Sequence, residues 1–201
     1  MIYDYADRVI KDMNRRNLRA FDKLKTLKFD ELNILRTVTK TYDESVELAK
    51  KRYLAIYSNA YLAACREAGK KREEPDDTIM DDWLLDMLED YDAVTHYRFN
   101  EETERKKART AEALVATKVD AREVERALKL WTLQVVTYAD RSVLDGRIQA
   151  FKDAGVKKVK WVTYGDERVC HDCRELDGKI YDIDKVPSRF HYRCRCYLVP
   201  V

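Results

Sequence analysis

The chain has 201 residues, of which 45% are hydrophobic and 38% are charged, and its formal net charge at pH 7 is +2. This composition is too apolar for a disordered chain and too charged for a membrane protein. The sequence contains neither the roughly 18 consecutive apolar residues of a membrane span nor the apolar core of a secretory signal. We therefore expect a protein made in a reducing cytoplasm, with no membrane partner and no charge-driven reason to bind nucleic acid.

The whole chain has only five glycines and three prolines, so few helix breakers interrupt its first three quarters. A first helix is expected over residues 2–28, with a break near Phe29 where Asp30 can cap the next turn. Thr41 and Glu44 have capping-box spacing, which predicts that a helix begins there. Its apolar residues recur at steps of three and four, namely Val46, Ala49, Tyr53, Ile56, Ala60 and Ala63.

The middle of the chain alternates charged loops with helical patterns. Residues 69–77 predict a loop, and a short helix is expected over residues 81–88. Asn100 can cap a further charged helix that reaches about Thr117. The helical body has long charged faces with interspersed tyrosines, of which the whole chain has thirteen, and tyrosine is enriched at protein interfaces, so we expect helix faces that dock on another protein.

The last long helix is predicted from a second capping box, at Asp120 and Glu123, and from a glycine stop at Gly155. One of its faces carries the apolar residues Val124, Ala127, Trp131, Val135 and Tyr138.

After this helix the texture changes to alternating β-branched and aromatic residues. Strands are expected over residues 156–164, 179–181 and 197–199. The sequence therefore predicts a mainly α protein with two domains. An elongated helical body of hairpins or a bundle occupies residues 1–155, and a small β-rich zinc-knuckle unit occupies residues 156–201.

Four of the five cysteines gather near the C-terminus at C-x2-C and C-x-C spacings, and a histidine accompanies them. In a cytoplasmic protein such clustering indicates a metal, with a pair of disulfides as the alternative for a protein that works outside the cell. Four ligands from this group make a tetrahedral zinc site, and the spacing leaves open which of the last three is not used. The candidate ligands are Cys170, Cys173, His191, Cys194 and Cys196. His171 is expected to point outward, and Cys65 to be a lone buried thiol.

The predicted zinc is structural. A catalytic zinc keeps one position open for water and has a general base nearby, whereas here ligands are in excess and no His-Glu-x-x-His pattern occurs. Residues 156–201 also contain few large apolar side chains, and units this small usually need a staple to fold. We therefore expect a protein that is not an enzyme and has no small-molecule substrate.

The residues around the cysteines follow a fixed order, which is Trp161, Asp166, Arg168, Cys170, Cys173, Asp177, Gly178, Pro187, His191, Cys194, Arg195 and Cys196. This order resembles the C-terminal signature of the phage Mu F-like family of minor head proteins, also called phage head morphogenesis proteins. The resemblance covers residues 161–200. Family members also tend to carry an Arg-Thr-Glu-like helix ahead of the tryptophan strand, and of that motif only Arg141 is retained here.

The resemblance implies a low-copy virion protein, made in the bacterial host cytoplasm and located inside the head near the portal vertex. It implies the portal protein, the major capsid protein or both as partners, and a role in head morphogenesis that extends in some relatives to DNA ejection. Packaged DNA is a further possible partner through the arginines Arg168, Arg174, Arg189, Arg193 and Arg195. The alternative is a DNA-binding or nuclease-like zinc protein acting on the phage genome, and a processing enzyme or toxin-like module is the least supported reading.

Overall fold

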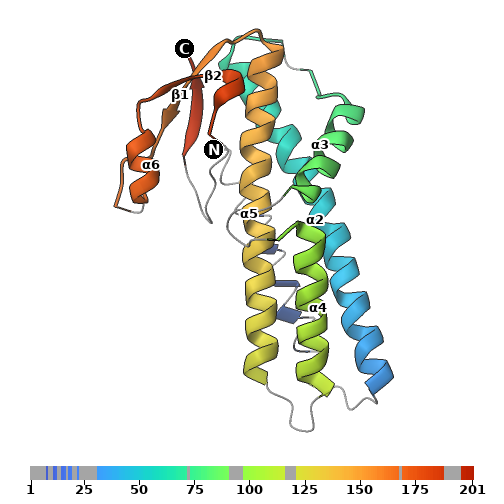
Figure 1. Cartoon of the computed structure of the whole chain (residues 1–201). Coiled ribbons are helices and arrows are strands. Elements are labelled where there is room, and N and C mark those ends of the chain that lie inside the picture. The colour runs from blue at the N-terminus through green and yellow to red at the C-terminus, as the bar shows by residue number, and fades with distance from the viewer. Residues whose placement is uncertain are drawn as a thin grey trace. The chain divides into compact units, whose positions relative to one another are not determined.

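A computed structural model describes residues 8, 11–12, 15–16, 18–19, 22, 31–71, 73–90, 97–115, 121–167, 169–187 and 196–201. In chain order their elements are α2 (Glu31–Glu67), α3 (Asp77–Glu89), α4 (Phe99–Val115), α5 (Ala121–Asp153), β1 (Lys158–Val162), α6 (His171–Leu176), β2 (Ile180–Asp182), a 3-10 turn (Ile183–Lys185) and β3 (Tyr197–Pro200) (Figure 1). The expected class, mainly helical with a small sheet near the C-terminus, is confirmed. No helix of the described ranges is long and apolar enough to cross a membrane.

Helix α2 is longer than the sequence predicts, because it passes straight through Thr41. The prediction that Thr41 caps a new helix is therefore wrong. Its hydroxyl instead donates a hydrogen bond of 2.8 Å to the carbonyl oxygen of Thr37, one turn earlier. A threonine inside a helix commonly satisfies its hydroxyl in this way, so capping-box spacing alone does not mark a helix start.

Most of the helix expected over residues 2–28, together with the break expected near Phe29, lies outside the described residues. The residues described between positions 8 and 22 are helical. The expected charged loop after α2 and the short helix α3 are both confirmed.

Helix α4 begins one residue earlier than the cap predicted for it. Asn100 lies in its first turn, so the prediction that Asn100 is the cap is wrong. The end is closed instead by Glu101, whose carboxylate accepts a hydrogen bond of 3.1 Å from the backbone N–H of Arg98. This contact satisfies one of the N–H groups that a helix start leaves without an intrahelical partner.

Helix α5 ends where the sequence predicts, while the proposed cap at Asp120 lies outside the described residues. The N–H of Gly155 donates to the carbonyl of Lys152 at 2.9 Å, and the N–H of Val156 donates to that of Phe151 at 2.9 Å. Gly155 has a φ of 75°, the left-handed conformation that glycine adopts without a steric cost. Together these features form a Schellman helix end, which releases the chain into β1.

A second glycine, Gly146, lies in the interior of α5, where glycine is normally unfavourable. A Cβ atom at this position would lie 2.5 Å from the backbone carbonyl oxygen of Tyr57 in α2. The glycine therefore lets the two helix backbones approach more closely than any side chain would allow.

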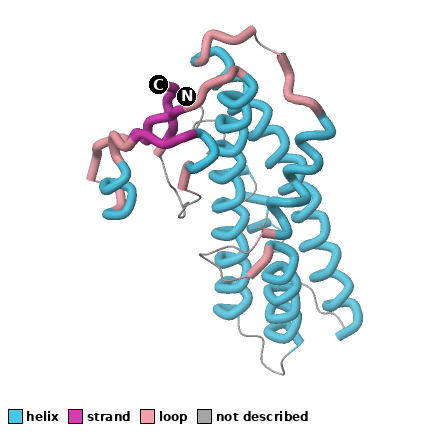
Figure 2. The backbone as a smooth tube through the Cα atoms, turned by 45° about the horizontal axis from the view of Figure 1, so that its top comes forward, coloured by secondary structure: helices cyan, strands magenta, loops and turns pink. Residues whose placement is uncertain are grey.

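The three strands form one antiparallel sheet in the order β2-β1-β3, drawn in magenta in Figure 2. The register pairs Val159 with Tyr181 on one side of β1 and Trp161 with Leu198 on the other. All three strands lie within a few residues of the predicted ranges. Helix α6 and the 3-10 turn were not predicted, because both are too short to show a hydrophobic period.

The chain divides into two compact units, each described here by itself. The described part of unit 1 comprises residues 53–81 and 137–201 with the gaps given above. Its core combines side chains from α2, α5 and the C-terminal segment, the largest groups being Tyr61, Leu62, Leu144, Phe151, Val159, Trp161, Ile183 and Leu198. The β-rich segment thus shares one core with the ends of two long helices.

The described part of unit 2 comprises residues within 8–52 and 82–136. Here polar side chains join the helices inside the core. The Tyr42 hydroxyl of α2 lies 2.8 Å from the Thr110 hydroxyl of α4, and the Tyr42 ring packs edge-on against Trp131 of α5 with centroids 5.4 Å apart. The Trp131 indole N–H donates to the Thr103 hydroxyl at 3.3 Å. These contacts fix the helices in one alignment because each buried polar group needs its partner.

Several tyrosines that we expected to dock on another protein belong to these cores. The buried ones include Tyr42, Tyr53, Tyr57, Tyr61 and Tyr138. For these five the expectation is wrong, because they lie on the same apolar stripes that pack the helices together.

Candidate metal centre

The C-x2-C motif lies on the first turn of α6. Cys170 is the residue that caps this helix, and its Sγ accepts a hydrogen bond of 3.4 Å from the backbone N–H of Cys173. A sulfur in this position satisfies one N–H of the helix start, as an oxygen side chain does at an ordinary cap. The C-x2-C segment therefore forms a cap followed by a helical turn, and both of its cysteines belong to unit 1.

Cys196 lies in the same core as the two knuckle cysteines. Cys173 is 4% exposed and Cys196 is 6% exposed, and both belong to the unit 1 core, against which the half-buried Cys170 also packs. Trp161 and Leu198 are further members of this core. Three of the five candidate ligands thus come from a turn and a strand start that are far apart in sequence and share one apolar environment.

The other two candidate ligands, His191 and Cys194, lie outside the described residues. Within the described part of the chain, no group of three or more His, Cys, Asp or Glu side chains is arranged to hold a metal ion. His171 lies on the exposed side of α6, with its side chain 84% exposed and its Nδ1 3.6 Å from the Glu175 carboxylate. Its position agrees with the expectation that it points outward.

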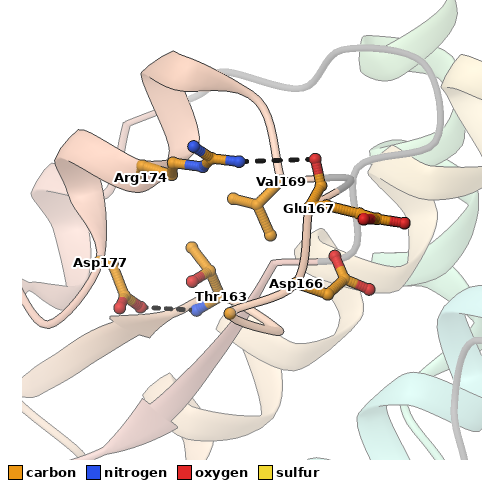
Figure 3. A pocket seen from close by; sticks show the side chains of 7 residues that line it. Thr163, Asp166, Glu167, Val169, Arg174 and Asp177 are labelled. Atoms are coloured by element: carbon orange, nitrogen blue, oxygen red, sulfur yellow. Dashed lines mark hydrogen bonds between the residues drawn. The ribbon is translucent and has the colours of Figure 1, made fainter.

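A hollow of about 380 Å³ adjoins the knuckle and is lined by Thr163, Gly165, Asp166, Glu167, Val169, Arg174 and Asp177 (Figure 3). Two hydrogen bonds close its sides. The backbone N–H of Thr163 donates to the Asp177 carboxylate at 2.7 Å, and the Arg174 guanidinium donates to the Glu167 carbonyl at 3.4 Å. The loop after β1 is thereby tied to Arg174 in α6 and to Asp177 at its C-terminal end.

The Asp-Gly turn of the motif completes this arrangement. Gly178 has a φ of 76°, and its N–H donates to the Trp161 carbonyl at 2.8 Å. Trp161 in turn accepts this bond from within β1 while its side chain is buried in the core. The tryptophan, the Asp-Gly turn and the C-x2-C knuckle are therefore parts of one connected structure.

Of the five arginines proposed to contact DNA or a partner, the structure describes only Arg174. Its guanidinium is exposed but shares the hollow with the acidic residues Asp166, Glu167 and Asp177. The other four lie outside the described residues, and they are Arg168, Arg189, Arg193 and Arg195.

One central residue of unit 1 was missed from the sequence. Arg147 is 2% exposed, and its guanidinium donates to the Glu67 carboxylate of α2 and, at 2.6 Å, to the Leu198 carbonyl of β3. The sequence does contain a sign of this burial, because Arg147 falls four residues after Val143 and four before Phe151, both of which are buried. A cation on an apolar helix stripe predicts a buried partner, since a buried charge must be paired.

Comparison with known proteins identifies one family that the chain matches. The family described as Phage Mu protein F like protein matches residues 85–199, which is more than half of the chain and includes α4, α5 and the whole knuckle. No curated protein and no solved structure matches the chain significantly. Because the match spans both the helices and the ordered motif residues, the chain belongs to the phage Mu protein F like family.

Proposed function

We propose that the protein is a structural minor head protein of a tailed bacteriophage that takes part in head morphogenesis. The observation that carries this proposal is the family match over residues 85–199, together with the motif residues from Trp161 to Cys196. In this role the protein is a virion component near the portal vertex and contacts the portal protein, the major capsid protein or both. It acts through binding, without a catalytic step.

The proposal includes one structural zinc ion, held by Cys170, Cys173 and two of the residues His191, Cys194 and Cys196. Two features of the described residues support it. The Cys170 sulfur accepts a hydrogen bond from the backbone N–H of Cys173, which places the two cysteines on one helical turn, and Cys196 is buried in the same core as Cys173. When bound, zinc supplies a tetrahedral crosslink, and the residues around it hold the C-terminal segment against the helix ends.

A co-expression experiment tests the head-protein role. The tagged chain is produced together with the portal protein and the major capsid protein of the phage that encodes it, and the complexes are purified at moderate salt. We expect one of the two proteins to be retained in a fixed ratio to the tagged chain. Each protein expressed with the tag alone is the control. Retention of neither would contradict the proposal.

The DNA-binding alternative has a separate test. Arg174, the described member of the arginine group, lines the same hollow as three carboxylates, and acidic neighbours oppose the approach of phosphates. We therefore expect no mobility shift of a DNA duplex at low salt. A shift at roughly 50 mM salt that disappears by roughly 200 mM would favour DNA binding instead. Metal-dependent cleavage of the duplex would favour a nuclease.

A further inference from the structure

One face of the three-stranded sheet packs on the helices, and the other faces away from the core. Val159 and Trp161 point into the core with exposures of 0% and 1%, so their neighbours along β1 point outward. The register extends this alternation to the other strands. We define the outer sheet face as Lys158, Lys160, Val162, Ile180, Asp182, Tyr197 and Val199.

The composition of the outer sheet face is unusual for a surface that faces only water. An antiparallel sheet with one solvated face normally alternates apolar residues inward with polar residues outward. Here four of the seven outward positions are apolar or aromatic, and Ile180 remains 54% exposed. Tyr164, which is 43% exposed, packs edge-on against Tyr197 with ring centroids 6.0 Å apart and extends the same surface.

The two lysines of this face, Lys158 and Lys160, have different neighbours across the strands. Lys158 is paired across the strands with Asp182, which also lies 3.5 Å from Lys185. Lys160, by contrast, is paired with Ile180 on β2 and with Val199 on β3. Its exposed ammonium group therefore lies at the centre of an apolar row, and no carboxylate faces it across either strand.

We propose that the outer sheet face binds an acidic surface of another protein. A carboxylate of the partner pairs with Lys160, while apolar side chains beside it cover Ile180 and Val199. This arrangement combines an apolar centre with a charge that fixes register, as protein interfaces do.

A nucleic acid fits this face less well than a protein does. Phosphates would pair with the two lysines and leave Ile180 and Val199 in contact with water. Single strands bind through stacking on aromatic platforms, whereas the centre of this face is aliphatic. The inference does not require the partner to be a head protein, so it stands or falls separately from the proposed function.

The probe for this face is a helical peptide with alternating glutamate and leucine on one side. The full-length chain is labelled with ¹⁵N, and backbone resonances are followed as the peptide is added at low salt. We expect shifts centred on Lys160, Ile180 and Val199. Lys160→Glu should weaken binding by about tenfold or more, because it turns an attraction into a repulsion. Lys71→Glu, an equal charge change on an exposed loop, is the matched control and should bind as the wild type does.

Four outcomes would overturn the proposal. The first two are a lack of shifts with the glutamate peptide and equal binding of a peptide with glutamine in place of glutamate. The third is a DNA duplex that shifts the same residues, which would assign the face to nucleic acid. The fourth is a set of concentration-dependent shifts at these residues in the protein alone, which would assign the face to a second copy of the chain.

Discussion

The guanidinium of Arg147 and the carboxylate of Glu67 form a two-pronged ion pair between α5 and the last turn of α2. The two partners differ in environment, since the arginine side chain is 2% exposed and the glutamate side chain is 41% exposed. The Leu198 carbonyl takes a further hydrogen bond, and the Phe151 ring lies 5.3 Å below the guanidinium carbon. One side chain therefore joins two helices and a strand in unit 1.

Replacing this arginine should loosen the attachment of β3 to the helices. Arg147→Met leaves the Leu198 carbonyl without its donor, and we expect a loss of about 2–4 kcal/mol in the free energy of unfolding. Glu67→Gln should cost less, because this side chain is 41% exposed and the amide oxygen still accepts one hydrogen bond from the guanidinium. Urea unfolding followed by circular dichroism gives both values. Equal costs for the two variants would show that the arginine has no special role.

The close approach of α2 and α5 can be tested by adding a single methyl group at Gly146. Gly146→Ala places a Cβ 2.5 Å from the Tyr57 carbonyl oxygen, so the helices must separate, at a cost of roughly 1–3 kcal/mol. Gly69→Ala is the comparison, because Gly69 has a φ of 70° and no atom within 4 Å of the added methyl. That variant bears only a conformational cost of about 1 kcal/mol. A smaller loss of thermal stability at Gly146 than at Gly69 would contradict the crowding.

Unit 2 should lose stability in alkali through a buried phenol. Burial, with a smaller contribution from the charge of Glu102, raises the pKa of Tyr42 from 10.0 to about 12. Thr110 itself donates to the Lys106 carbonyl at 2.9 Å, so the Tyr42 hydroxyl is the donor in their bond. A phenol whose pKa is higher in the folded state stabilises it below pH 10, and this contribution is lost as the pH rises toward 12.

The variant Tyr42→Phe lacks this titration. Its stability deficit relative to the wild type should shrink by about 2–3 kcal/mol between pH 10 and pH 12. Urea midpoints measured at several pH values over this range provide the test. Tyr164→Phe removes an exposed phenol and serves as the control. If the stability deficit of Tyr42→Phe stayed constant between pH 10 and pH 12, the loss of stability in alkali would come from a group other than Tyr42.

The zinc proposal predicts a pattern across single variants. Protein purified under reducing conditions should contain about one zinc per chain, and Cys170→Ser and Cys173→Ser should each lose it. Cys65→Ser should keep it, because Cys65 is not a proposed ligand. One of three further variants should also keep the metal and so identify the spare side chain, the three being His191→Ala, Cys194→Ser and Cys196→Ser. Protein with neither zinc nor reactive thiols would indicate disulfides.

The helices could be predicted from sequence because burial follows their period. Ala49, Tyr53, Ile56 and Ala60 were assigned to one stripe of α2, and all four are buried. The helix starts were less predictable. In a chain this rich in charge and threonine, the spacing of Thr41 and Glu44 arises inside a helix as readily as at its start.

The candidate site was predictable only where its residues are close in sequence. The C-x2-C knuckle and the turn at Gly178 follow from local spacing and from the conformation that only glycine adopts freely. The pairing of Arg147 with Glu67 joins residues 80 positions apart, and that of Tyr42 with Thr110 joins residues 68 apart. Contacts at such separations depend on how the helices pack, and a single sequence does not contain this information.

The family segment begins at residue 85, yet the core beneath the knuckle also contains Tyr61, Leu62 and Cys65, and Glu67 reaches Arg147 from the same helix. A fragment that begins at residue 85 would expose Phe151 and Trp161 to water. It would also leave the guanidinium of Arg147 without its partner Glu67. The segment that matches the family and the set of residues that pack into this core thus have different limits. Experiments on the knuckle in isolation need the second half of α2 to be supplied with it.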